Sequence, residues 1–131
     1  MSTRPLIKPY SVITVGNMAS ASITSSVTII QSLSMLSYAY SWSGTSPVGT
    51  IKVQVSNDYS VDPAGAVKNS GTWNDMTFTS AGSSVSSLAV SGNTGNGFID
   101  MSNLSGYALR TVYTKTSGTG TLQCVLNAKV A

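Results

Sequence analysis

The stretch Ser34–Asp58, SMLSYAYSWSGTSPVGTIKVQVSND, decides the predicted fold. Apolar side chains alternate with small polar ones on both sides of its centre, at Leu36, Tyr38, Tyr40 and Trp42 and again at Ile51, Val53 and Val55. Alternation with a period of two, in aromatic and β-branched residues, is typical of a half-buried strand. The central SGTSPVG holds two glycines and a proline, which favour a turn. The stretch therefore predicts two strands joined as a hairpin, with one apolar face that belongs to a core.

A second hairpin is predicted at the C-terminal end. YALRTVYTK and TLQCVLNAKV flank SGTG, where Gly118 and Gly120 can supply the positive φ of a tight reversal. The chain ends almost directly after the second arm, so we expect this end to be part of a sheet. The sequence predicts burial of Val53, Val55, Tyr113 and Leu122.

The rest of the chain reads as further short strands between turn-forming segments. They are expected at residues 12–15, 21–31 with a bend at Ser25–Ser26, 73–79, 85–90 and 98–101. No segment has the 3.6-residue periodicity and caps of a helix, and no repeat of fixed period is present. About eight to ten strands with regular turn signals indicate an all-β domain, a jelly-roll-like antiparallel β-sandwich over residues 10–131.

The composition indicates a surface with few charges. Only 8% of residues are charged, against roughly 25% in typical soluble domains. The 131 residues include 24 serines and 15 threonines, and glutamate is absent. Such a hydroxyl-rich surface suits a protein that packs against other proteins. The seven basic residues are scattered, at Arg4, Lys8, Lys52, Lys68, Arg110, Lys115 and Lys129, so nucleic-acid binding is not expected.

The groups that most enzymes use are scarce. Histidine is absent, and no pair of carboxylates is marked as a glycosidase pair. Asp58 and Asp62 share one loop, but their spacing does not match a calcium loop, and turn chemistry is the better interpretation. Cys124 is the only cysteine, so no intrachain disulfide forms, and its strand context predicts a buried thiol. We expect no enzyme activity, no metal and no cofactor.

Residues 1–9 are predicted to form an extended N-terminal arm. Pro5 and Pro9 disfavour both a helix and a central strand. Arg4, Leu6, Ile7 and Lys8 would give the arm cationic and apolar contacts with a partner. No run reaches the ~18 apolar residues of a membrane span, and no signal-peptide core is evident, so we expect synthesis in a cytoplasm without export.

Three motifs carry a resemblance to known proteins. They are the glycine-initiated strand that ends in SND (residues 49–58), the Trp-Asn-Asp segment at 73–75, and the strand and SGTGTL turn at 109–122. Together they span about the last two thirds of the chain. The chain resembles the jelly-roll decoration, or cement, proteins of tailed bacteriophages, which bind outside icosahedral capsids.

The resemblance implies a non-enzymatic virion structural protein. Its partners would be the major capsid protein and copies of itself, and its place the exterior of the capsid after synthesis in the host cytoplasm. The alternative is a tail or fibre component with a carbohydrate-binding β-sandwich, in which Trp42, Trp73 and Asn-rich loops would contact a glycan. Most of the aromatic residues fall on faces that also carry aliphatic ones, which indicates a core role.

Overall fold

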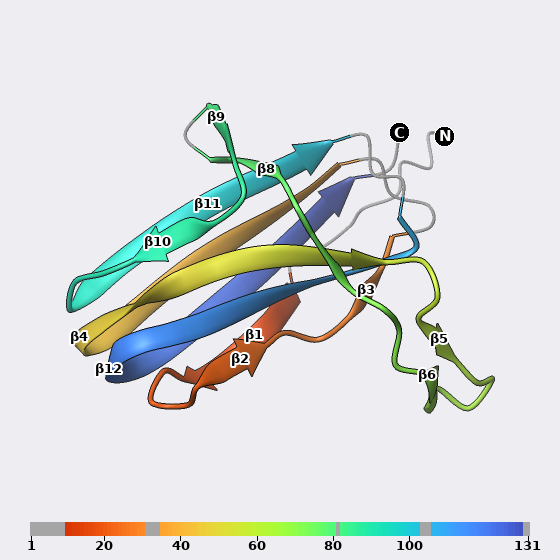
Figure 1. The fold of residues 1–131 in the computed structure, drawn as a ribbon, viewed down its shortest axis with the longest axis horizontal. Helices are drawn as coiled ribbons and strands as arrows, with labels where there is room; N and C mark the ends of the chain where they lie inside the picture. The colour runs from red at the N-terminus through yellow and green to blue at the C-terminus, as the bar shows by residue number, and fades with distance from the viewer. Residues whose placement is uncertain (1–9, 31–34, 81, 103–105, 130–131) are drawn as a thin grey trace, which may run out of the picture.

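The computed structural model describes residues 10–30, 35–80, 82–102 and 106–129. These ranges contain twelve strands and no helix, which confirms the all-β prediction. Ten strands form one antiparallel sheet, and β5 and β6 form a small sheet of their own (Figure 1). The strands are β1 (Tyr10–Asn17), β2 (Ser22–Thr24), β3 (Thr28–Ile29), β4 (Met35–Ser56), β5 (Ser60–Val61), β6 (Val67–Asn69), β7 (Asn74–Met76), β8 (Phe78–Ser80), β9 (Ser83–Val85), β10 (Leu88–Val90), β11 (Thr94–Ser102) and β12 (Ala108–Lys129).

The fold is built around β4 and β12, which contain 22 residues each. They pair with each other almost from end to end, from Met35 opposite Lys129 to Ser56 opposite Ala108. Both strands turn back at the same point, near residues 46 and 117, so the two-stranded ribbon folds over on itself (Figure 1). We call residues 35–45 and 119–129 the first half of the ribbon, and residues 49–56 and 108–115 the second half.

Glycine and asparagine allow the ribbon to bend. Gly118 has a φ of +82°, and a Cβ there would collide with the carbonyl of Ser46. Gly120 is equally restricted, because a Cβ would lie 2.5 Å from the carbonyl oxygen of Ser43. Ser46 has a positive φ of 47°, and its amide donates to Oδ1 of Asn93 at 2.8 Å. The turn residues seen in the sequence therefore bend a continuous ribbon.

Each half of the ribbon is flanked by different strands. In the first half, β1 pairs with β12 and β11 pairs with β4, and β8 and β9 continue the sheet beyond β11. In the second half, β2 and β3 pair with β12, whereas β7 and β10 pair with β4. β10 pairs with β4 in the second half, and the next strand, β11, pairs with β4 in the first half.

The core lies between the two halves. The predicted alternation is confirmed at Leu36, Tyr38, Tyr40, Trp42, Ile51 and Val53, all of which are buried. Side chains of the two halves meet: the Tyr40 hydroxyl lies 2.7 Å from Oγ1 of Thr111. Tyr113 and Leu122 are buried as predicted, whereas Val55 is only half-buried.

Several finer predictions are wrong. The arms predicted as hairpins do not pair with each other in the described residues; each arm of β4 pairs with an arm of β12 instead. The expected strand at 73–79 is split, because β7 pairs with β4 and β8 pairs with β11. The loop after Asp58 contains β5 and β6, which were not predicted. The antiparallel all-β part of the jelly-roll-like β-sandwich prediction is confirmed, and the main sheet is a single ten-stranded one, since β4 and β12 run through both halves.

Candidate interaction surface

The N-terminal residues predicted to contact a partner, Arg4, Leu6, Ile7 and Lys8, lie outside the described residues. The description begins at Tyr10, where β1 pairs with the last part of β12, opposite Leu126. The arm and its partner contacts therefore stay a prediction.

The carboxylates of the loop after β4 have structural roles. Oδ1 of Asp62 accepts the amides of Ala64 and Ala66, both at 2.9 Å, which closes the β5–β6 turn. Oδ1 of Asp58 accepts the Thr72 amide and the Ser56 hydroxyl, and Oδ2 accepts the Thr72 hydroxyl at 3.0 Å. These bonds, the Thr72 amide first, lower the pKa of Asp58. The prediction of turn chemistry is confirmed at Asp62, whereas Asp58 connects the beginning of the loop to Thr72 near its end.

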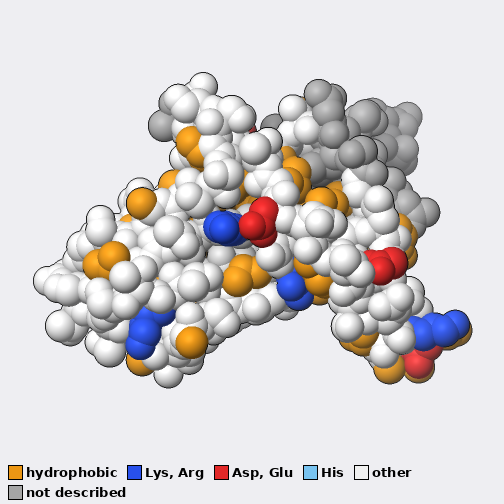
Figure 2. Space-filling view, viewed as in Figure 1, with side chains coloured by type: hydrophobic (Ala, Val, Ile, Leu, Met, Phe, Trp, Pro, Cys, Tyr) orange, Lys and Arg blue, Asp and Glu red, His pale blue; other side chains and the backbone are white. Residues whose placement is uncertain are grey.

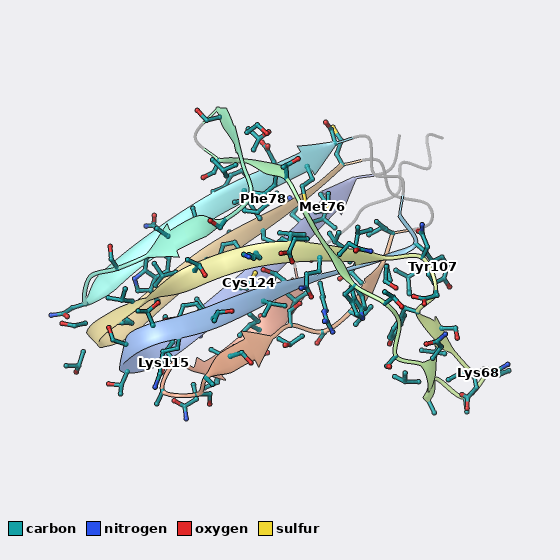
Figure 3. All side chains as sticks on the ribbon, viewed as in Figure 1. Lys68, Met76, Phe78, Tyr107, Lys115 and Cys124 are labelled. Carbon is teal, nitrogen blue, oxygen red and sulfur yellow. The ribbon has the colours of Figure 1, made fainter. Side chains whose placement is uncertain are left out.

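Two residues that the sequence singled out belong to the core. Cys124 is buried beneath the strands (Figure 3), and burial raises the pKa of its thiol well above the ordinary value. Trp42 is 7% exposed, and its indole N–H donates to the carbonyl of Ser91 at 3.3 Å. Trp42 is therefore not a platform for a glycan.

Neither a metal centre nor a membrane helix can be identified in the parts of the chain that are described. Across residues 10–30, 35–80, 82–102 and 106–129, no three side chains of the metal-ligating types come together. No helix in the same ranges is long and apolar enough to cross a bilayer.

Charged side chains are sparse and scattered on the visible face of the molecule (Figure 2). Lys68 lies on the β5–β6 hairpin at one end, and Lys115 lies at the other end near β2 (Figure 3). The Lys115 ammonium donates to the carbonyl of Ala19 at 3.0 Å. Between described residues, Lys52 and Asp75 form the single ion pair, at 3.3 Å. The basic residues that are described thus form no continuous stripe.

One broad surface is the outer side of the first half, which we call the β11–β4–β12 face. In an antiparallel sheet, directly opposite residues point to the same side. Phe98 lies opposite Ala39, and Ala39 lies opposite Val125, so the three form an apolar row. Phe98 is 56% exposed. Hydroxyl and amide side chains surround the row: Ser37, Ser41, Ser43, Thr94, Asn96, Ser102, Thr121, Gln123 and Asn127.

A hollow opens at one end of the β11–β4–β12 face. It has a volume of about 380 Å³ and lies between Phe98 and the exposed side chain of Met35. Its other lining residues are Leu36, Ser37, Thr79, Asp100, Met101, Ser102 and Asn127. Asp100 carries the one charge among the described side chains of the face. The hollow therefore offers apolar surface and hydroxyl groups, with a single carboxylate.

A second surface lies on the outer side of the second half, around Trp73. The guanidinium carbon of Arg110 lies 4.2 Å from the centroid of the Trp73 ring. Tyr59 packs against the same indole, with the ring centroids 5.9 Å apart, and the indole N–H donates to the carbonyl of Ser70 at 2.8 Å. We call Tyr59, Trp73 and Arg110 the Arg110 cluster. All three side chains are half-buried.

A chain of hydrogen bonds also fixes Arg110. Its Nε donates to Oε1 of Gln54 at 2.9 Å, and Nε2 of Gln54 donates to Oδ1 of Asp75 at 3.0 Å. The pKa of Asp75 is lowered by the hydrogen bond from Gln54 and by Lys52. Partial burial lowers the pKa of Arg110. The guanidinium is thus held by an aromatic ring over its carbon and by an amide oxygen at Nε.

The sequence did not predict the Arg110 cluster. Alternation places Lys52 and Gln54 on the outer side of β4, but it does not show that Arg110 lies opposite Gln54. Asp75 reaches Gln54 only because β7 pairs with the second half of β4. The one available signal was Trp73 in the polar context GTWND, which set it apart from the core aromatics.

The fold is similar to that of one solved phage-related protein. The chain superposes on the crystal structure of the SPBc2 prophage-derived protein YomS with a TM-score of 0.65, over 97% of each chain and at 12% sequence identity. No protein-family model matches the sequence, and no curated protein matches it. At this identity the similarity establishes a shared fold.

Proposed function

We propose that this chain is a non-enzymatic virion structural protein, a decoration protein that binds the outside of an icosahedral phage capsid. The observation that carries the proposal is the shared fold with a prophage-derived protein, which extends over 97% of both chains. Together with the motifs at 49–58, 73–75 and 109–122, it favours a phage origin. In this role the chain is made in the host cytoplasm and stabilises contacts between shell subunits.

Under this proposal the folded sheet is a jelly roll whose two sheets stay joined through the bends. The strand order supports this interpretation, with β1, β12, β4 and β11 side by side in the first half and β2–β3, β12, β4 and β7 or β10 in the second. A jelly roll pairs its strands in this way when a long two-stranded ribbon is rolled up. Such a block is rigid enough to connect shell subunits.

The β11–β4–β12 face supports contact with further copies of this chain. The row Phe98–Ala39–Val125 provides apolar area, and the surrounding hydroxyl and amide groups can form hydrogen bonds without the desolvation of charges. A decoration protein occupies many equivalent sites, so modest contacts at each site add up across the particle.

The proposal is tested on purified particles. Quantitative mass spectrometry is expected to find this chain at a copy number comparable to that of the major capsid protein. A few copies per particle would instead place it in the tail or a fibre, and its absence from particles would contradict the virion role.

The arm adds a second test. Removal of residues 2–9 is expected to leave the melting temperature of the isolated protein nearly unchanged while weakening its retention on particles. Ordering nine residues costs roughly 1–2 kcal/mol each in backbone entropy, so the contacts of Arg4, Leu6, Ile7 and Lys8 must be extensive. Equal retention of the truncated and full-length proteins would remove the arm from the interface.

The competing function is a tail or fibre component that binds a glycan, and one observation favours it. Trp73 is half-buried beside Tyr59, outside the core, so part of an aromatic surface is accessible. However, Arg110 stacks on the indole, and the indole N–H is already bonded. A glycan array decides between the functions: specific binding that Trp73→Ala abolishes would support the fibre role.

A further inference from the structure

Arg110 is a cation that the described residues leave without a counter-ion. Only its Nε has an acceptor among them, the side chain of Gln54. The nearest carboxylate along this chain of bonds, Asp75, is paired with Lys52 and bonded to Gln54. The two terminal amino groups of the guanidinium have no acceptor within the described residues. Within the described part of the chain, nothing occupies these two groups, and their geometry suits a bidentate bond.

From this geometry we infer that Arg110 is the anchoring residue of an interface and binds a carboxylate, an Asp or Glu side chain of the shell protein. The inference rests on the proposed function, since it names the chemistry of the partner surface. A guanidinium matches the two oxygens of a carboxylate with two parallel N–H groups.

The cluster is arranged before any partner arrives. The Trp73 ring supports one side of the guanidinium at 4.2 Å, and Gln54 holds Nε at 2.9 Å. Asp75 in turn fixes the orientation of Gln54. An arginine that is already held loses little side-chain entropy on binding, which favours affinity. Arginine, tryptophan and tyrosine, the three residue types of the Arg110 cluster, are common in binding hot spots.

A single carboxylate fits the surroundings better than a polyanion. Asp75 is connected to Arg110 through Gln54, and Asp58 is bonded to Thr72, the neighbour of Trp73. These two negative charges oppose a nucleic acid, which normally contacts a patch of several cations. One carboxylate pairs with one guanidinium and adds no further repulsion at the rest of the surface.

The experiment uses particles from a strain that lacks the gene for this chain, with purified full-length protein added back. The amount of bound wild-type protein, measured at increasing protein concentrations until the particles are saturated, gives its Kd. Arg110→Gln is expected to weaken binding by at least about tenfold, and Arg110→Lys should weaken it nearly as much, since lysine cannot form the planar fork. Circular dichroism and thermal melting confirm that each variant is folded.

Lys115→Gln is the matched control, since it removes the same charge at the end of the molecule opposite the β5–β6 hairpin (Figure 3), whereas that hairpin directly follows Tyr59 of the cluster. Its Kd is expected to stay within about twofold of wild type. Full-affinity binding by a folded Arg110→Gln protein, or equal losses in Arg110→Gln and Lys115→Gln, would overturn the inference. Failure of the wild-type protein to bind particles would instead contradict the proposed function.

Discussion

The hydroxyl of Tyr40 lies 2.7 Å from Oγ1 of Thr111, across the interior and 71 residues away in the chain. Thr111 donates its own proton to the carbonyl of Lys52 at 3.0 Å, so Tyr40 must be the donor to Thr111. The Thr111 amide donates to Oγ of Ser25, which brings the segment between β2 and β3 into the same network. This buried polar chain connects the two halves of the folded ribbon.

The network predicts a large effect of a small change at Thr111. Thr111→Val keeps the shape but leaves the buried Tyr40 hydroxyl without its acceptor, so the free energy of unfolding should fall by about 1–3 kcal/mol. Urea denaturation of the variant and the wild-type protein measures this change in the free energy of unfolding. Thr114→Val, at an exposed position of the same strand, is the control and should change stability by less than about 0.5 kcal/mol.

Adding Tyr40→Phe to Thr111→Val tests the pair itself. The double variant removes both partners, so its loss should be smaller than the sum of the two single losses. Strictly additive losses would contradict a direct bond between the two hydroxyls.

The bend predicts different outcomes for two glycines with the same φ. Gly118 and Gly82 both have φ of +82°, but a Cβ at Gly118 collides with the Ser46 carbonyl, whereas a Cβ at Gly82 meets nothing within 4 Å. Gly118→Ala should therefore destabilise the protein by clearly more than the roughly 1 kcal/mol expected for Gly82→Ala. Thermal or urea unfolding of the two variants gives the comparison. Similar losses would show that close contact at the bend contributes nothing.

The pH dependence of stability should depend on Asp58. Its lowered pKa means that the folded state favours the carboxylate, first through the Thr72 amide and then through the Ser56 and Thr72 hydroxyls. This contribution is present above the ordinary carboxyl pKa and is lost as the pH falls through the lower folded pKa. Asp58→Asn should therefore flatten the decline of the free energy of unfolding between about pH 5 and about pH 2.

Thr72 offers a matched pair for the same prediction. Thr72→Val removes the hydroxyl bond to Oδ2 and should raise the Asp58 pKa, measured by NMR titration, whereas Thr72→Ser keeps the bond. Equal pKa values in these two variants would contradict the role of the hydroxyl.

The thiol of Cys124 should be inert in the folded protein. It is buried in the core, and burial raises its pKa, so little thiolate forms at neutral pH. A thiol reagent such as DTNB should label the native protein only at the rate of unfolding, and label one thiol per chain in urea. Rapid labelling without denaturant would show that the first half of the ribbon opens readily.

The sequence by itself determined most of the positions in β4 and β12 that face the core. The alternation in β4 and β12 predicted the buried positions of Tyr38, Tyr40, Trp42, Val53 and Leu122, because side chains on a strand alternate between two environments whatever the strand pairs with. It also placed turn chemistry at Asp62 and Gly118. These are local properties, so they can be read from neighbouring residues.

Only the tertiary structure decided which strands are partners. A turn signal such as SGTSPVG looks the same whether its arms pair with each other or bend together as part of a longer ribbon. Long-range pairing of β4 with β12 decided the second outcome. The same pairing places Arg110 opposite Gln54, and the pairing of β7 with β4 brings Asp75 to Gln54. The Arg110 cluster thus depends on contacts between segments that are distant in sequence, for which alternation along one strand carries no information.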